Sequence, residues 1–458
     1  MTEIENETIA AIATPFGKGA VSIIRISGTN TLQIINKIFH SKTNRDVSAP
    51  GIYIGTVYNN ENNIIDEVQL IIKRAPKSYT GEDTAEINCH GGILVTEKVL
   101  NRVLEAGARL AAPGEFSLRA VLNDKMDLIQ AEAVNEIINA KTDKSLDVAL
   151  SQLSGRISVY IDNISETLRK LLVNLEVSID HPDEDIEFVN YANIKKDIIE
   201  TINNIDKILS TARAGKAFNY GIKAVIIGKA NVGKSSLFNA LLKKDKAIVS
   251  HIEGTTRDII EDWIDVSGIP VKLIDTAGYK EAIDMLEQMA LKKTESAIET
   301  ADLIIMLFDA TKNISDDEIN IVKKISLLNI PVIYALNKID KKIIFNKNKI
   351  EKLIHSDIIN ISVSENKGLN LIEKAIKNEI LGKDFTDDII ITNIRAEVSL
   401  KEAKKYLEYT LNSINENAPE EFIASDIRLA LNELESIIGK FTTDDMLNSI
   451  FSNFCIGK

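Results

Sequence analysis

Five short runs of β-branched and apolar residues alternate with amphipathic segments between about residue 220 and residue 381. Polar or glycine-bearing loops follow these runs, which span residues 223–227, 271–274, 303–308, 332–336 and 358–361. Alternation of this kind predicts a mainly parallel sheet that is covered by helices. Ligands bind at the carboxyl ends of the strands in such sheets, so we expect functional residues in the loops after the runs.

The segments on either side of this sheet are predicted to be helical. Glycine and proline are rare from about residue 128 to residue 214, and leucine recurs there at the spacing of an amphipathic helix. The same pattern returns from about residue 395 onward. We therefore expect a helical domain built from residues 121–219 and 382–458, with an α/β domain of residues 220–381 inserted in it. Residues 1–120 are expected to form a third, α+β domain.

Charge and cysteine content limit the classes of protein that the chain can be. Its 458 residues include 54 basic and 67 acidic side chains, and the net charge of −13 argues against a general nucleic-acid coat or a basic membrane binder. Two cysteines are too few for a disulfide framework. The N-terminal residues MTEIENETIA carry glutamates where a targeting peptide carries basic residues, and no apolar run approaches the roughly 20 residues of a membrane span. A cytoplasmic protein without a membrane partner is expected.

A glycine-rich motif lies between the first strand of the sheet and a helix that is predicted to begin near Lys234. Residues 228–236 read GKANVGKSS and fit the pattern G-x-x-x-x-G-K-[ST]. The glycines let the backbone curl so that its N–H groups face phosphate oxygens, Lys234 reaches the outer phosphates, and the hydroxyl of Ser235 binds Mg²⁺. For this pattern alone, a simple glycine turn before a helix is the alternative.

Two further motifs follow the second and fourth strands. In residues 275–278, which read DTAG, the carboxylate can hold Mg²⁺ through water and the last N–H can meet the terminal phosphate. In residues 337–340, which read NKID, the carboxylate of Asp340 can accept the ring N–H and the exocyclic amine of guanine. Adenine has no such donor pair. Each motif alone is compatible with an ordinary polar turn, but their order on successive strands favours a guanine nucleotide site.

This α/β segment resembles a GTPase domain of the translation-factor type, and residues 254–258 (GTTRD) resemble the first switch of the TrmE-Era-EngA-like group. The resemblance makes Thr256 the second Mg²⁺ ligand. Residues 362–364 (SVS) stand where the loop that supports guanine usually reads Ser-Ala-Lys, and its backbone contact is expected to be kept. The residues implied in GTP binding are Asn231, Val232, Gly233, Lys234, Ser235, Ser236, Ser250, His251, Ile252, Glu253, Gly254, Thr255, Thr256, Asp275, Thr276, Ala277, Gly278, Asn337, Lys338, Asp340, Ser362 and Val363.

The second switch lacks the glutamine that orients the attacking water in Ras-like proteins. Tyr279 stands in its place, and Glu287 is the carboxylate expected to position the water directly or through a bridging water. The resemblance also implies a bound K⁺ in the role of an arginine finger, with Arg257 as the alternative. Neutral oxygen ligands suit this cation. The expected K⁺ ligands are Asn231, Ser250, Ile252 and Thr255. The expected catalytic residues are Glu287, Lys234 and Asn231.

The resemblance to known proteins extends beyond the GTPase segment. Residues 454–458 read FCIGK, and the N-terminal region contains ATPFGKGAVSIIRISG at 13–28, YTGEDTAEINCHGG at 79–92 and APGEFSLRAVLNDKMDLIQAEAV at 112–134. Together with a GTPase domain inserted in a helical domain, these segments are similar to the MnmE (TrmE) family of tRNA modification GTPases over essentially the whole chain.

This resemblance implies a function beyond GTP hydrolysis. It implies an N-terminal domain that is similar to folate-binding folds and forms a homodimer, and a hetero-oligomer with a flavin-dependent GidA-type (MnmG) partner that carries the FAD. Together the two proteins would add an aminomethyl or carboxymethylaminomethyl group to carbon 5 of the wobble uridine of certain tRNAs. The one-carbon donor would be a reduced folate, 5-formyl- or methylene-tetrahydrofolate.

The family pattern also implies the residues of the folate site. They are Arg25, Glu82, Lys125 and Lys458. Positive and carboxylate side chains match the glutamate tail and the polar pterin edge of a folate. Cys455 in the tail has either a chemical or a positioning role, whereas Cys89 is expected to pack as a small apolar residue.

Two functions of other classes remain as alternatives. One is a regulatory GTPase that binds RNA or the ribosome and performs no one-carbon chemistry, as Era does. The other is a structural dimer in which the nucleotide is a static ligand. Binding of a reduced folate would distinguish the tRNA-modifying enzyme from both alternatives.

Overall fold

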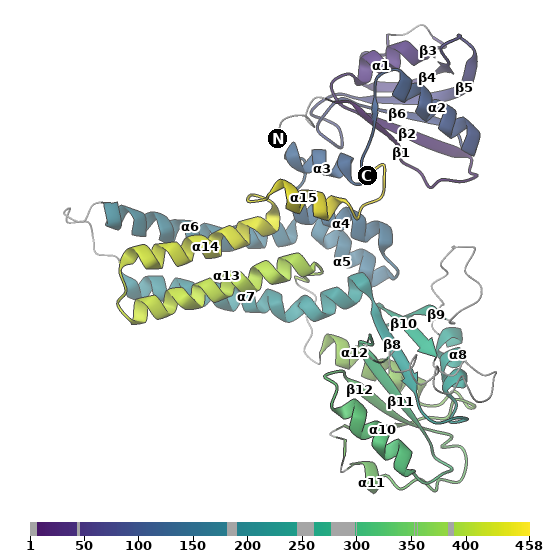
Figure 1. The fold of residues 1–458 in the computed structure, drawn as a ribbon, viewed down its shortest axis with the longest axis vertical. Coiled ribbons are helices and arrows are strands. Elements are labelled where there is room, and N and C mark those ends of the chain that lie inside the picture. Colours follow the sequence, from purple (N-terminus) through teal and green to yellow (C-terminus); the bar gives the residue numbers. More distant parts are fainter. Residues whose placement is uncertain are drawn as a thin grey trace. The chain divides into compact units, whose positions relative to one another are not determined.

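The structure is a computed structural model. It describes residues 7–43, 46–180, 190–244, 261–275, 298, 300–351, 353–354, 356–382 and 389–458. The chain divides into two compact units, each of which combines segments that are far apart in sequence (Figure 1). The first unit comprises Met1–Asn135, Gln152–Val173 and Ile427–Lys458, and the second comprises Glu136–Ser151 and Asn174–Asp426. Among the described residues, no helix is long and apolar enough to cross a lipid bilayer.

The first unit contains a largely antiparallel sheet with the strand order β3-β4-β5-β6-β2-β1-β7. Its strands are β1 (Ile9–Ile12), β2 (Val21–Ser27), β3 (Phe39–Ser41), β4 (Gly51–Tyr58), β5 (Ile64–Lys73), β6 (Thr84–His90) and β7 (Arg109–Leu110). Strand β7 pairs with β1 in parallel, and the other pairs are antiparallel. Helices α1 (Thr31–Ile38) and α2 (Ile93–Glu105) contribute buried side chains to one apolar core with these strands.

The rest of the first unit is helical. It contains α3 (Glu115–Leu122), α15 (Asp444–Phe451), the start of α4 (Leu128–Asn139), and parts of α6 (Arg156–Asp180) and α14 (Glu420–Ile438). Leu128, Phe451 and Phe454 share a buried cluster, which anchors the C-terminal residues to this unit. The guanidinium of Arg169 on α6 donates to Glu435 on α14 over 2.8 Å. The two stretches of helical sequence predicted to belong together are thus in contact here.

The second unit contains a six-stranded sheet with the order β13-β12-β11-β8-β10-β9. Its strands are β8 (Ile222–Ile227), β9 (Glu261–Val266), β10 (Ile269–Asp275), β11 (Leu303–Asp309), β12 (Val332–Asn337) and β13 (Ile358–Asn360). Successive residues of β11 alternate between two apolar cores, one on each face of the sheet. Burial on both faces explains the uninterrupted apolar runs that predict a parallel sheet.

The predicted strands are confirmed, and one strand was missed. Strand β9 reads EDWIDV and pairs with β10 in the antiparallel direction, whereas the other pairs are parallel. A mainly parallel sheet is therefore correct. Three of the six residues of β9 are acidic, so its sequence does not form an apolar run that would predict a strand.

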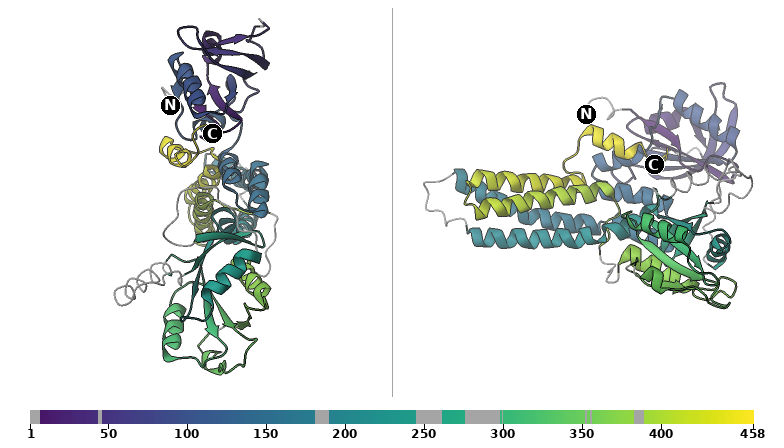
Figure 2. Two further views of the ribbon diagram at one scale, coloured as in Figure 1. Left: turned by 90° about the vertical axis from the view of Figure 1, so that its right-hand side faces the viewer. Right: turned by 60° about the horizontal axis from the view of Figure 1, so that its bottom comes forward.

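Helices of the second unit cover the sheet and extend away from it. They are α7 (Tyr191–Tyr220), α8 (Lys234–Lys244), α10 (Asp316–Ser326), α11 (Asn348–Glu351), α12 (Leu369–Leu381) and α13 (Ile394–Asn415), together with most of α5 (Asp143–Leu153). Helices α7 and α13 run side by side (Figures 1 and 2). They are joined by ion pairs of Lys216 with Glu397 and of Lys404 with Asp206. Gly221 ends α7 at a φ of +76°, and β8 begins at the next residue. The helical and α/β parts are therefore continuous here.

Candidate functional site

The phosphate-loop motif forms a tight turn between β8 and α8. Asn231 and Gly233 have φ values of +62° and +105°, the left-handed region that favours glycine. The ammonium group of Lys234 donates to the carbonyl oxygens of Gly228 and Lys229, each over 2.8 Å, so it lies across the turn. Helix α8 begins at Lys234, as predicted. The first N–H groups of a helix have no intrahelical acceptor, and they suit an anion beside this turn.

The loop after β12 packs directly against this turn. The side-chain amide of Asn337 is buried and donates to the carbonyl oxygen of Val232 over 2.9 Å. Its carbonyl oxygen accepts the backbone N–H of Val363 over 3.1 Å. A Cβ atom on Gly233 would lie 2.4 Å from the amide nitrogen of Asn337, so glycine is required for this approach. One asparagine thus holds three separate loops together.

Lys338 and Asp340 extend the same arrangement. The ammonium group of Lys338 donates to the carbonyl oxygen of Asn231 over 2.7 Å and pairs with Asp309 over 2.6 Å. The hydroxyl of Ser362 donates to the exposed carboxylate of Asp340 over 2.6 Å, and this bond lowers the pKa of Asp340 below its ordinary value. Asp340 is therefore an ionised acceptor at the surface, positioned from one side by Ser362.

The remaining nucleotide residues are placed only in part. Ser235 and Ser236 are exposed in the first turn of α8. Asp275 ends β10, where its backbone is paired with Ile226 of β8 next to the phosphate loop. The following residues lie outside the described residues: Ser250, His251, Ile252, Glu253, Gly254, Thr255, Thr256, Thr276, Ala277, Gly278 and Glu287.

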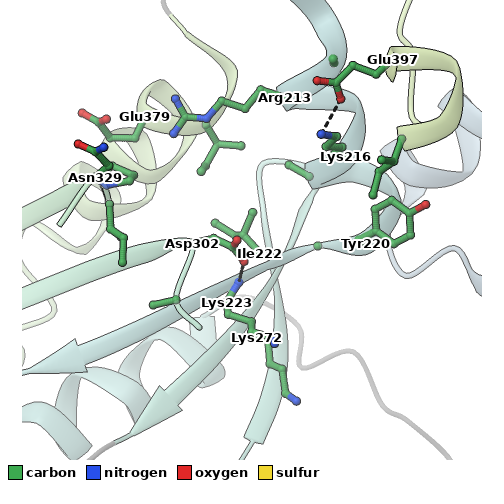
Figure 3. A pocket seen from close by; sticks show the side chains of 18 of the residues that line it. Arg213, Lys216, Tyr220, Ile222, Lys223, Lys272, Asp302, Asn329, Glu379 and Glu397 are labelled. Carbon is green, nitrogen blue, oxygen red and sulfur yellow. Dashed lines mark hydrogen bonds and ion pairs between the residues drawn. The ribbon is translucent and has the colours of Figure 1, made fainter. Parts of the chain in front are cut away.

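A separate cavity of about 1030 Å³ lies at the amino ends of the same strands (Figure 3). Lys223 at the start of β8 and Asp302 before β11 line it, and the Asp302 carboxylate accepts the backbone N–H of Lys223 over 2.8 Å. Lys216 and Glu397 pair with each other at its wall. Because the phosphate loop follows the carboxyl end of β8, this cavity is not the nucleotide site.

A second group of charged residues surrounds the C-terminal tail in the first unit. The guanidinium of Arg25 on β2 donates to Glu86 over 3.0 Å and to the carbonyl oxygen of Gly457 over 3.2 Å. It also lies 5.6 Å from the ring centre of Tyr79 and 5.8 Å from that of Phe116. Aromatic faces and a carboxylate therefore fix the direction of Arg25.

The tail is fitted closely into this place. Gly457 has a φ of +92°, and a Cβ atom there would lie 2.4 Å from the carbonyl oxygen of Ile12. The backbone N–H of Lys458 donates to the carbonyl oxygen of Cys455 over 3.3 Å. Burial lowers the pKa of the Lys458 ammonium, and the positive charge of Arg25 lowers it further. The positive charges of Arg25 and Lys458 thus disfavour each other, and a nearby anion would stabilise both.

Glu82 lies in the loop before β6, and Lys125 lies in the turn between α3 and α4. Glu82 accepts the hydroxyl of Ser27 over 2.6 Å, and it pairs with the buried Arg119 over 3.1 Å. The side chain of Lys125 passes close to Gly81, where an added Cβ atom would lie 3.2 Å from its Cγ. Ser27 and Arg25 both lie on β2, two residues apart. The bond from Ser27 therefore holds Glu82 beside the strand that carries Arg25.

The chain was compared with protein families and with known proteins. A family model described as "MnmE helical domain" matches residues 128–455, and one described as "GTP-binding protein TrmE N-terminus" matches residues 8–125. The tRNA modification GTPase MnmE of Clostridioides difficile is 39% identical over 459 residues, and that of Thermoanaerobacter pseudethanolicus is 41% identical over 459 residues. Each alignment covers 99% of both chains. The chain belongs to the MnmE family of tRNA modification GTPases.

The comparison with solved structures found GTPases. The Era protein of Aquifex aeolicus bound to GDP and AlF₄⁻ is 28% identical over 40% of this chain and 66% of that chain, with a TM-score of 0.28. The G domain of the FeoB iron transporter of T. maritima is 26% identical over 34% of this chain and 96% of that chain, with a TM-score of 0.26.

Three partners in this MnmE-family chain were missed by sequence reasoning. Arg119 is buried between Glu82 and Glu115, Glu86 holds Arg25, and Asp309 holds Lys338. Arg119 lies within a family-like segment, so its position could have been noted, but nothing local distinguishes Glu86 or Asp309. The prediction for Cys89 is confirmed, because it is 2% exposed within the sheet core and burial raises the pKa of its thiol. Cys455 is exposed.

Proposed function

We propose that this GTPase acts with a flavin-dependent GidA-type (MnmG) partner to modify carbon 5 of the wobble uridine of certain tRNAs. A reduced folate, 5-formyl- or methylene-tetrahydrofolate, supplies the carbon, and the FAD belongs to the partner. The observation that carries the GTPase part is the set of bonds from Asn337 and Lys338 to Val232 and Asn231. These bonds join the loop after β12, which would bind the base, to the phosphate loop. The two loops can therefore hold the base and the phosphates of one nucleotide at a fixed separation.

At the nucleotide, each described side chain has a distinct task. The ionised carboxylate of Asp340 accepts the two N–H donors of guanine, and Val363 keeps the base loop in place through Asn337. Lys234 exchanges its two carbonyl acceptors for phosphate oxygens. The exposed hydroxyl of Ser235 at the start of α8 suits a Mg²⁺ ligand, with Thr256 as the proposed second ligand. Mg²⁺ would neutralise phosphate charge as the bond to the leaving group breaks.

For hydrolysis, we assign positioning of the water to Glu287 and binding of K⁺ to Asn231, Ser250, Ile252 and Thr255. Asn231 is exposed in the phosphate loop, and its backbone is in the left-handed region. Its side-chain carbonyl is therefore accessible to a cation. A neutral amide oxygen is a suitable ligand for a large monovalent cation. K⁺ would add positive charge beside the phosphates, the role that an arginine has in other GTPases.

For folate, we assign Arg25 and Lys458 to the negatively charged glutamate tail, and Glu82 and Lys125 to the polar pterin edge. The depressed pKa of Lys458 beside Arg25 supports an anionic ligand, because an added carboxylate would favour both cations. Arg119 and Ser27 keep Glu82 oriented. Cys455 is exposed in the same tail and is close enough in sequence to Lys458 to have a chemical or a positioning role.

The proposed homodimer uses the N-terminal sheet. Ile52 and Ile54 on β4 are 64% and 61% exposed, and Ile64 at the start of β5 is 64% exposed. Ile52 and Ile54 share one face of β4, whereas Ile64 pairs with Tyr58 at the other end of that strand. Exposed apolar side chains on one face of a strand are typical of a protein interface. We further propose the domain limits 1–120, 121–219, 220–381 and 382–458, in which the second and fourth segments form one helical domain.

The GTPase proposal is tested by changing the base acceptor. Asp340→Asn replaces a carboxylate that accepts two bonds with an amide that matches xanthine. Hydrogen bonds to charged groups contribute about 1.5 to 3 kcal/mol each, so loss of two should weaken GTP binding by roughly 10²- to 10⁴-fold. XTP binding should strengthen. Equilibrium titration with both nucleotides measures the change.

Ser362→Ala is the matched control, because it removes the bond that positions Asp340 but keeps the carboxylate. It should weaken GTP binding without improving XTP binding. Undiminished preference for GTP in Asp340→Asn would contradict the assignment. Separately, GTP hydrolysis without binding of 5-formyl-tetrahydrofolate would favour the regulatory GTPase over the folate-dependent enzyme.

A further inference from the structure

Asp309 is a buried carboxylate at the carboxyl end of β11 that no step above uses. Its residue is 5% exposed, although it lies beside the nucleotide loops. A buried charge is costly unless it is paired and hydrogen-bonded. The partners of Asp309 therefore indicate what this carboxylate stabilises.

Both carboxylate oxygens of Asp309 are engaged. Oδ1 accepts the backbone N–H of Thr311 over 2.9 Å and its hydroxyl over 2.7 Å. Oδ2 accepts the ammonium of Lys338 over 2.6 Å. Burial alone would raise the pKa of Asp309, but the bonds from Lys338 and Thr311 outweigh it and hold the pKa below its ordinary value. Asp309 is thus a fixed negative charge whose orientation is set by Thr311.

The bond to Lys338 connects Asp309 to the phosphate loop. The same ammonium donates to the carbonyl oxygen of Asn231 over 2.7 Å. A lysine side chain is flexible, and an ammonium bonded only to one backbone carbonyl could adopt several rotamers. The carboxylate of Asp309 supplies a second, charged contact to the same ammonium group. The order of contacts is Thr311, Asp309, Lys338 and Asn231.

We propose that Asp309 is a positioning residue for guanine nucleotide binding, which acts by holding Lys338 against the carbonyl oxygen of Asn231. This inference rests on the proposed function and adds a residue to its nucleotide site. Asp309 contacts neither base nor phosphate itself; it fixes the distance between the loop that reads the base and the turn that holds the phosphates. Removing its charge leaves Lys338 partly buried beside a neutral group and frees the side chain to leave Asn231.

The test is a double-mutant cycle on the full chain, with the dissociation constant of GDP measured by titration at fixed Mg²⁺. Asp309→Asn keeps the shape of the side chain, and Lys338→Met removes the ammonium. Each single variant should weaken GDP binding at least tenfold. The double variant should bind GDP within about twofold of Lys338→Met, because residues that act through one contact are not additive. Double-variant affinity equal to the product of both single losses would overturn the proposal.

Asp302→Asn is the matched control. Asp302 lies just before β11, at the other end of the same strand, and accepts the backbone N–H of Lys223. Its replacement should leave GDP affinity unchanged even where the thermal midpoint falls. If Asp309→Asn likewise lowers only the midpoint measured without nucleotide, Asp309 is merely structural and the proposal fails.

Thr311→Val keeps the test decisive if Asp309→Asn does not fold. It removes one of the donors that orient Asp309 and should weaken GDP binding a few-fold, whereas full affinity would overturn the proposal. Failure of the unmodified chain to bind GDP would contradict the proposed function itself, and so is distinguishable from failure of this inference.

Discussion

Replacing Gly457 by alanine should release the C-terminal tail from the first unit. The residue has a φ of +92°, and the new Cβ would lie 2.4 Å from the carbonyl oxygen of Ile12 and 3.0 Å from the Cα of Ala13. Both are backbone atoms, which cannot rotate away as a flexible side chain can. The tail must therefore move, and its movement breaks the bond from Arg25 to the carbonyl oxygen of Gly457.

The size of this effect follows from two contributions. A non-glycine residue in a sparsely populated backbone region costs about 1 to 3 kcal/mol. A hydrogen bond to a charged group contributes about 1.5 to 3 kcal/mol. Their sum of roughly 2.5 to 6 kcal/mol corresponds to a decrease of about 10²- to 10⁴-fold in the ratio of docked to released tail.

Two measurements follow this change. Digestion of the tail by carboxypeptidase should accelerate, because cleavage tracks the population of the released form when release is rapid. Binding of 5-formyl-tetrahydrofolate should weaken by at least 100-fold, whereas GTP hydrolysis should stay near its normal rate. Deletion of Ile456–Lys458 should likewise weaken folate binding and leave GTP hydrolysis near its normal rate, since it removes Lys458 and the Gly457 carbonyl together.

Gly107→Ala is the matched control for backbone strain. Gly107 belongs to the same unit and has a φ of +121°, but an added Cβ meets no atom within 4 Å. It should destabilise the chain without releasing the tail. Normal tail protection and normal folate affinity in Gly457→Ala would refute the reasoning, and equal loss of folate binding and GTP hydrolysis would show that the tail also serves the GTPase.

Two further predictions concern hydrolysis. Glu287→Ala should slow GTP turnover by about 10²- to 10⁴-fold with GTP affinity nearly unchanged, because water-positioning groups contribute on that scale; normal turnover would show that Glu287 has no part in hydrolysis. Hydrolysis should be at least tenfold faster in potassium than in sodium chloride at equal ionic strength, and Asn231→Ala should remove this preference while nucleotide still binds. Equal rates of the unmodified chain in both salts would exclude the K⁺ mechanism and direct attention to Arg257.

The fold was predictable where periodicity or spacing carries the signal. Strand β11 is buried along its whole length, and β8 is buried except at Lys223, so their sequences are mostly apolar. The glycine motif located the start of α8 at Lys234. Strand β9 could not be found in this way, because it borders the sheet and pairs only with β10 among the described strands. Its acidic residues are compatible with an edge strand, which has a neighbouring strand on one side only.

The candidate sites were predictable to the extent that function fixes local sequence. The motifs identified Asn337, Lys338 and Asp340, whose spacing is set by one loop. The partners Asp309 and Glu86 come from other strands, and each carboxylate resembles many surface carboxylates in sequence. Pairing of this kind depends on the arrangement of strands in the sheet. It becomes visible only when the register is known.

The bond from Arg25 to Gly457 also imposes an order on biosynthesis, because its two residues are 432 positions apart. At about 5 to 20 residues per second, a ribosome makes the second partner roughly 20 to 90 seconds after the first. Strands β1 to β7 are complete within the first 110 residues and can pair long before that. A nascent chain that stops short of Gly457 would keep its N-terminal sheet and lack the tail contact. Formation of the contact between Arg25 and Gly457 therefore reports that translation has passed Gly457.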